Sequence, residues 1–109
     1  MSYDLVLLPT AGPLDVDRAR DAFRIAEGEG EELVWEAQAL TATILLTPAE
    51  IGIGVSGEDA PAAERARDFA ALLDAILEAA AVTRARVHDP QLGRDLGRGD
   101  IADAVAQFA

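Results

Sequence analysis

The stretch DAPAAERARDFAALLDAILEAAAV, residues 59–82, is the longest regular pattern in this sequence. Its apolar residues recur at steps of three and four, which indicates one amphipathic helix with a buried face. Ser56 or Asp59 is expected to cap the first turn, and Pro61 suits an early position that needs no amide donor. The core-facing positions predicted from this period are Ala62, Ala66, Phe69, Leu72, Leu73, Ile76, Leu77 and Ala80.

Length and composition predict one globular domain spanning residues 1–109. Half of the residues are apolar, at 50%, yet no apolar run is long enough to cross a membrane. The opening residues MSYDLVLLPT lack the basic region of a signal peptide, and the chain has no cysteine, which excludes disulfides and thiolate chemistry. A cytoplasmic location is therefore expected.

The charge balance argues against several partners and cofactors. Net charge is −11 and the isoelectric point is about 4.2, so nucleic acid and anionic membranes are expected to be poor partners. The chain contains no lysine, which removes Schiff-base catalysis and a P-loop lysine from consideration. We expect no cofactor. The excess of alanine, arginine and aspartate is typical of a GC-rich bacterial genome.

The remaining elements follow from shorter signals. We predict strands over residues 3–8, 43–47, 51–55 and 83–88, with a turn at 48–50 and a short return strand within 91–99. Asp15 is expected to cap a helix that ends at Gly28, and Asp100 to cap a short last helix. The order predicts an α+β fold, a ferredoxin-like βαββαβ sandwich with a short C-terminal helix.

Residues 33–40 are ambiguous between helix and strand. The spacing of Leu33, Val34, Ala37 and Leu40 fits a helix, whereas Val34 and Trp35 favour a strand. A short apolar run cannot be assigned by period alone, so both alternatives stay open.

The glycine-rich segment GIGVSG, residues 52–57, matches the G-x-G-x-x-G pattern of dinucleotide-binding loops. Its glycines alternate with Ile51, Ile53 and Val55 as in a strand, and the chain leaves no room for a complete dinucleotide-binding unit. We therefore predict a strand and no nucleotide site. Gly52 and Gly54 would share one face and leave space for a helix or another chain to pack closely.

Candidate catalytic and metal-binding residues are few. His88 is the only histidine, and Asp89 beside it is the one carboxylate that sequence places near it, so the two are weak candidates for acid–base work. Neighbouring strand residues point to opposite faces, which favours a surface histidine. The acidic segment EGEGEE, residues 27–32, lacks the ligand spacing of a calcium loop and is interpreted as a solvated turn without metal.

Two segments at opposite ends of the chain resemble a family of small, largely uncharacterised bacterial proteins. These are SYDL at residues 2–5 and VHDPQLGR at residues 87–94, which follows the long helix. Members of that family open with SYDL and carry V-Y-D-P-Q-L-G-R at the end of a strand. This chain has His88 in place of the usual aromatic residue and Asp95 in place of an apolar one. The resemblance implies no catalytic residues.

Three functions compete at this stage. The acidity, small size and lack of catalytic clusters favour a non-catalytic protein-interaction domain, of the immunity type or accessory to another protein. Its partner would be basic, and the expected partner-binding residues are Asp17, Asp21, Glu27, Glu29, Glu31 and Glu32. One alternative is a small-ligand or enzymatic pocket near Tyr3, Trp35 and His88. The other is a structural homodimer formed through a sheet edge or the glycine face.

Overall fold

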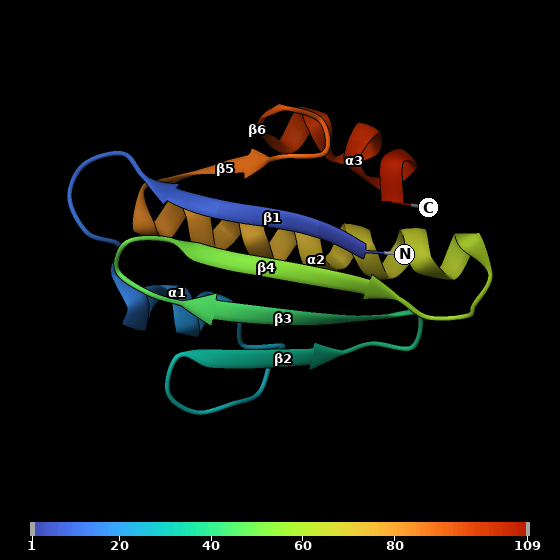
Figure 1. The fold of residues 1–109 in the computed structure, drawn as a ribbon, viewed down its shortest axis with the longest axis horizontal. Coiled ribbons are helices and arrows are strands. Elements are labelled where there is room, and N and C mark those ends of the chain that lie inside the picture. The colour runs from blue at the N-terminus through green and yellow to red at the C-terminus, as the bar shows by residue number, and fades with distance from the viewer. Residues whose placement is uncertain (1, 109) are drawn as a thin grey trace.

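Six strands form one antiparallel sheet in the computed structural model, which describes residues 2–108 (Figure 1). Their order across the sheet is β2-β3-β4-β1-β5-β6. The bounds are Ser2–Pro9 for β1, Glu32–Glu36 for β2, Leu40–Leu46 for β3, Ile51–Gly57 for β4, Ala85–Asp89 for β5 and Arg94–Leu96 for β6. The α+β class is confirmed. The ferredoxin-like order is not confirmed, because the strand order across the sheet is different: the sheet has six strands where that fold has four, with β2 and β6 as its edges.

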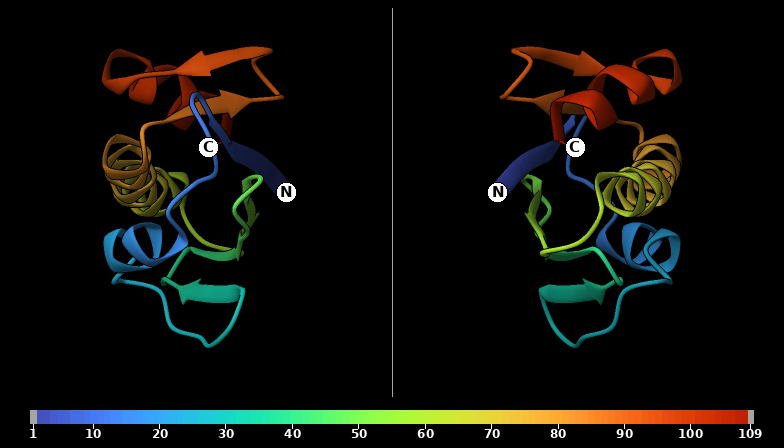
Figure 2. Two further views of the ribbon diagram at one scale, coloured as in Figure 1. Left: turned by 90° about the vertical axis from the view of Figure 1, so that its left-hand side faces the viewer. Right: turned by 90° about the vertical axis from the view of Figure 1, so that its right-hand side faces the viewer.

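The helices α1 (Val16–Ala22) and α2 (Ala62–Thr83) cover one face of this sheet (Figure 2). A 3-10 turn (Arg98–Asp100) leads into α3 (Ile101–Phe108), which packs against α2. The core lies between the sheet and the helices and holds the odd-numbered residues of β1 and β4, with the even-numbered ones on the other side. This alternation follows from the two-residue period of a strand.

The long helix α2 has the predicted core face over most of its length. Its buried residues are Phe69, Leu72, Leu73, Ile76, Ala79 and Ala80. Two details of the prediction are wrong. Pro61 is the N-cap and makes no side-chain hydrogen bond, so neither Ser56 nor Asp59 caps the helix. Ala62 is exposed, because the first turn of α2 extends beyond the edge of the core.

Helix α1 begins as predicted, with the Asp15 carboxylate accepting a hydrogen bond from the Arg18 amide. It ends at Ala22, well before the predicted end at Gly28. The reason is a competing backbone pair: Glu27 and Val34 exchange N–H···O bonds of 2.9 and 2.7 Å, which draws this segment to the sheet edge.

The ambiguous residues 33–40 form strand β2 and the turn that leads into β3. Trp35 lies opposite Ala42 in the β2–β3 ladder, and Leu33 lies opposite Ile44. The spacing of apolar side chains left helix and strand equally open for this segment. Backbone hydrogen bonds to β3 decide in favour of the strand. The predicted hairpin that follows is confirmed, since β3 and β4 pair along their whole length.

At the C-terminal end, the predicted strand, short return strand and last helix are all present. Asp100 lies within the 3-10 turn and accepts from the Gly97 amide at 2.8 Å, so it closes that turn instead of capping α3 directly. Ala104 and Phe108 of α3 are buried, and the Phe108 ring stacks on Phe69 with centroids 4.4 Å apart.

Candidate partner-binding surface

A surface groove runs from the edge of the sheet along the outer side of helices α1 and α2. Its largest part is a hollow of about 640 Å³ lined by Ile25, Glu27, Gly28, Val34, Trp35 and Glu36. A second hollow shares Ile25 and Trp35 with it and continues over α2, and a third shares Ala22, Arg24 and Glu78 with the second. We call these three joined hollows the Trp35 groove.

Two apolar side chains form the centre of the groove. Trp35 comes from β2 and packs partly against the core, while Ile25 is 42% exposed. Ile25 lies outside the core because α1 ends at Ala22 and the chain turns before it reaches the sheet edge. An exposed aliphatic residue beside a tryptophan is typical of an interface centre, where aromatic anchors are enriched.

Backbone geometry fixes the wall of the groove beside Glu27. Gly28 has φ +152°, and a Cβ there would lie 2.3 Å from the Glu32 carbonyl oxygen, so only glycine fits this close approach. The Glu27–Val34 bridge also occupies part of the β2 edge, which leaves less of this strand open to pairing with other chains.

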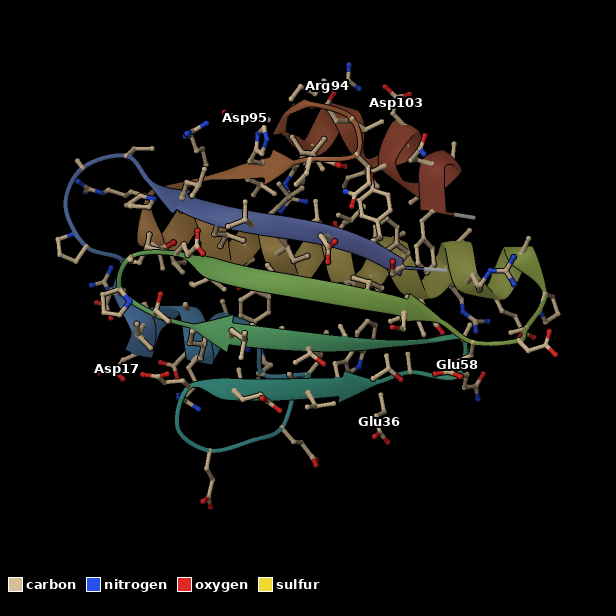
Figure 3. All side chains as sticks on the ribbon, in the orientation of Figure 1. Asp17, Glu36, Glu58, Arg94, Asp95 and Asp103 are labelled. Carbon is tan, nitrogen blue, oxygen red and sulfur yellow. The ribbon has the colours of Figure 1, made fainter. Side chains whose placement is uncertain are left out.

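Carboxylates surround the apolar centre. Glu27 and Glu36 line its first hollow, and Asp74 and Glu78 of α2 line the second. Figure 3 shows Glu36 projecting from the sheet edge on the side of the molecule where Asp17 also lies. This arrangement provides apolar contact area and a negative rim together, which suits a basic partner with an apolar side chain.

The arginines of the groove already pair with its acids, but weakly. Arg24 Nη2 is 3.3 Å from Glu78 Oε1, and Arg98 Nη1 is 3.3 Å from Asp74 Oδ1. All four side chains are largely exposed, and exposed pairs of this kind contribute only about 0–1 kcal/mol. A cation on a partner could therefore replace either arginine at little cost.

The structure exposes all six acids predicted to bind a partner, but it gathers only some of them into the groove. Glu27 lines the first hollow and Asp21 the third. Asp17 is on α1, Glu29 and Glu31 are in the following connection, and Glu32 begins β2. Sequence reasoning missed Ile25, Glu36, Asp74 and Glu78 as members. For Glu36 one sequence signal was available: it directly follows Trp35, so a strand there would place both residues at the same sheet edge.

A second cluster joins the two segments that carry the family resemblance. The Asp89 carboxylate is completely buried and accepts a hydrogen bond from the Tyr3 hydroxyl. Its other oxygen accepts from the Gln91 amide at 2.9 Å, the Gln91 side chain at 2.8 Å and the Leu92 amide at 3.1 Å. Burial raises the pKa of Tyr3 well above its ordinary value, and the hydrogen bond and charge of Asp89 raise it further.

Gln91 completes this cluster by binding the backbone of β1. Its side-chain amide accepts from the Asp4 amide at 2.8 Å and donates to the Asp4 carbonyl at 2.7 Å, as a neighbouring strand would. The cluster thus ties the β5–β6 turn to the first strand. A carboxylate whose oxygens are buried and filled by donors serves to hold strands together, and it is poorly placed to take a proton from a substrate.

The candidate acid–base pair His88 and Asp89 is not brought together. Asp89 faces the core, while His88 lies on the opposite face with its Nδ1 atom 3.1 Å from Asp95 Oδ1. Arg86 also donates to Asp95, at 3.2 Å to each oxygen. The hydrogen bond with His88, followed by that from Arg86, lowers the pKa of Asp95. Pairing of His88 with Asp95 across the β5–β6 hairpin is the register that sequence reasoning missed.

The alternative pocket near Tyr3, Trp35 and His88 is not assembled by the fold either. Tyr3 is buried in the core, with its ring centroid 5.0 Å from that of Phe69. Trp35 lies in the edge strand β2, and His88 lies in β5, four strands away and on the opposite face. These three residues therefore share no site.

Neither a metal site among the described residues nor a known relative assigns a function to this chain. Within residues 2–108, no group of three or more histidines, cysteines or acids could hold a metal ion. No helix in the same range has the length and apolar character needed to cross a membrane. No protein-family model matches the chain, and no curated protein matches it significantly. The family resemblance of its two terminal segments therefore stays a prediction.

Proposed function

We propose that this protein is a non-catalytic interaction domain that binds a basic protein partner in the Trp35 groove. The observation that carries the proposal is the pair of accessible apolar side chains, Ile25 and Trp35, surrounded by carboxylates. An immunity-type or accessory role is consistent with such a surface, because both act by holding another protein.

Electrostatics would steer the partner to this surface. The net charge of −11 sets up a negative field, and a basic partner is drawn along it with an association rate that falls as salt rises. Ile25 and Trp35 would then provide the salt-insensitive part of the affinity, because burial of apolar area depends little on ionic strength. The two contributions can be separated by experiment.

The test is retention of proteins from a lysate of the source organism on the immobilised chain, at low and high salt. The apolar variant Trp35→Ala/Ile25→Ser is compared with Leu45→Ser, which alters an exposed leucine on the opposite face. The acidic variant Glu27→Gln/Glu36→Gln is compared with Asp95→Asn/Asp103→Asn, which removes the same charge near β6 and α3, at the opposite edge of the sheet from β2 (Figure 3).

We expect one basic protein to be retained at low salt, released as salt rises, and lost from both groove variants but not from either control. Circular dichroism of each variant confirms that it is folded. Equal retention by groove variants and controls would contradict the proposal, because binding would then depend on total charge and not on this surface.

A further inference from the structure

Within residues 2–108, no helix covers the second face of the sheet. Figure 1 views this face, and Figure 2 shows α1 and α2 together on its far side. The strands place Val34, Leu45, Val6 and Leu8 on it, together with small or polar residues, and Leu45 is 49% exposed. One solvated face is common in antiparallel sheets. This face differs in carrying apolar residues across several strands, and a contiguous apolar patch marks an interaction surface.

A hollow lies at the middle of this face. It has a volume of about 470 Å³ and lies over Gly52 and Gly54, between Val6 on one side and Thr43 and Leu45 on the other, and the carboxylates of Asp4 and Glu50 also line it. A Cβ at Gly52 would meet nothing within 4 Å. The face therefore carries a projecting leucine directly beside an unfilled depression.

The register makes this pair self-complementary. Leu45 lies opposite Gly52 in the β3–β4 ladder, and Thr43 lies opposite Gly54. A two-fold axis that runs parallel to the strands, midway between β3 and β4, exchanges these two strands between copies. Leu45 of each copy then lies above Gly52 of the other. Because sheets twist, the strands of the two copies become less well aligned with increasing distance from such an axis. Leu45 and Gly52 lie beside the axis, so the twist affects their contact little.

The same axis brings charged residues of the two copies together near the edges of the open face. Glu32 shares a cross-strand row with Leu45, Gly52, Val6 and His88, through successive register pairs. The rotation brings Glu32 of one copy within about one strand spacing, ~4.8 Å laterally, of His88 in the other copy. Arg86 lies on the same face two residues away and also reaches this position. Arg86 and His88 both contact Asp95 on this face, so Glu32 of one copy meets a cluster of two basic side chains and one acid in the next.

We infer that a second copy of this chain packs on the open sheet face, with Leu45 of each copy filling the glycine hollow of the other. This isologous contact is the expected form of a homodimer, since both partners use one surface. Four strands of each copy would face each other over a patch roughly 20 Å wide and roughly 20 Å long. This area, roughly 400 Å² per copy, is below that of a standard stable interface, so the dimer should be weak and concentration-dependent. The inference does not rest on the proposed function, because its central contact, between Leu45 and Gly52, lies outside the Trp35 groove.

The experiment is sedimentation equilibrium over about 5 to about 500 µM chain, a range that covers weak interfaces. The mass is expected to rise from 11.5 kDa toward twice that value. Leu45→Arg and Gly52→Arg should each stay monomeric across the range. Val82→Arg is the matched control, because Val82 is 40% exposed on the helical side, and it should dimerise like the unaltered chain.

Charge exchange tests the geometry. Glu32→Arg alone and Arg86→Glu alone are each expected to weaken the dimer about tenfold or more, and the double exchange to restore it. A monomer at every concentration would overturn the inference. So would a dimer that Val82→Arg weakens as much as Leu45→Arg, because the contact would then not lie on the open face. Failure of both single exchanges to weaken association would overturn the proposed axis.

Discussion

Replacing Tyr3 by phenylalanine removes one hydroxyl from the cluster that joins the two ends of the chain. The ring itself should stay in place, because it is buried and packs against Phe69 at 5.0 Å and Phe108 at 6.2 Å. The change therefore isolates the hydrogen bond that the Tyr3 hydroxyl donates to the Asp89 carboxylate.

The expected loss of stability follows from two features of this hydrogen bond: its acceptor is charged and it is buried. Hydrogen bonds to a charged group contribute about 1.5–3 kcal/mol to stability, more than neutral ones. The Asp89 carboxylate keeps its other donors, from Gln91 and Leu92, so it is not left unpaired. We expect Tyr3→Phe to lower the free energy of unfolding by about 1.5–3 kcal/mol at neutral pH.

The raised pKa of Tyr3 adds a dependence on pH. Above pH 10.0, the ordinary value, the unfolded tyrosine loses its proton while the folded one keeps it. The unfolded state then binds fewer protons, so the free energy of unfolding falls as pH rises, by about 1.4 kcal/mol per pH unit. The stabilisation is complete below pH 10.0 and is lost above it. Tyr3→Phe lacks this slope, so the difference between the two proteins should shrink as pH rises.

Urea unfolding at pH 7 and at several values above 10, followed by Trp35 fluorescence, measures both effects. The chain contains one tryptophan and one tyrosine, so neither signal is mixed, and no lysine titrates in this range. Ultraviolet titration of the native protein reports Tyr3 directly. A loss below about 0.5 kcal/mol at pH 7, or equal slopes for the two proteins, would refute the reasoning.

Three further substitutions test other parts of the fold by urea unfolding. Leu73→Ala empties a position that is 1% exposed and should cost about 2–5 kcal/mol; a loss below about half a kcal/mol would mean that its side chain is not in the core. Gly28→Ala should cost about 1–3 kcal/mol because of its positive φ and the Glu32 carbonyl, whereas Gly52→Ala, with free space, should cost little. Gln91→Ala should cost about 1–2 kcal/mol through its lost bonds to the Asp4 backbone, and an unchanged midpoint would count against that pairing.

The period of apolar residues predicts the parts of this fold that depend on local sequence. Steps of three and four place Phe69, Leu73 and Ile76 on the buried face of α2, and alternation places Ile51 and Ile53 on the buried face of β4. The Asp15 cap also follows from sequence, because its acceptor reaches an amide only three residues away. Such signals succeed when the groups involved are close together in the chain.

The candidate site was harder to predict, because it combines residues from separate elements. The acidic side is visible in the sequence as a local excess of charge. The groove itself depends on the early end of α1, which exposes Ile25, and on the position of β2, which presents Trp35 and Glu36 beside it. The helical period of the sequence could not predict that α1 ends at Ala22, because the Glu27–Val34 bridge competes with continuation of the helix.

Local sequence therefore determined the long helix, the alternating strands, their turns and the strongly negative charge. Only the tertiary structure decided that residues 33–40 pair as an edge strand, that the sheet has six strands, and that Tyr3 meets Asp89. Those two residues are 86 positions apart, and nothing in either segment names its partner. The physical reason is that strand order and buried polar pairing depend on contacts between distant segments, whose energies appear only after the chain has folded.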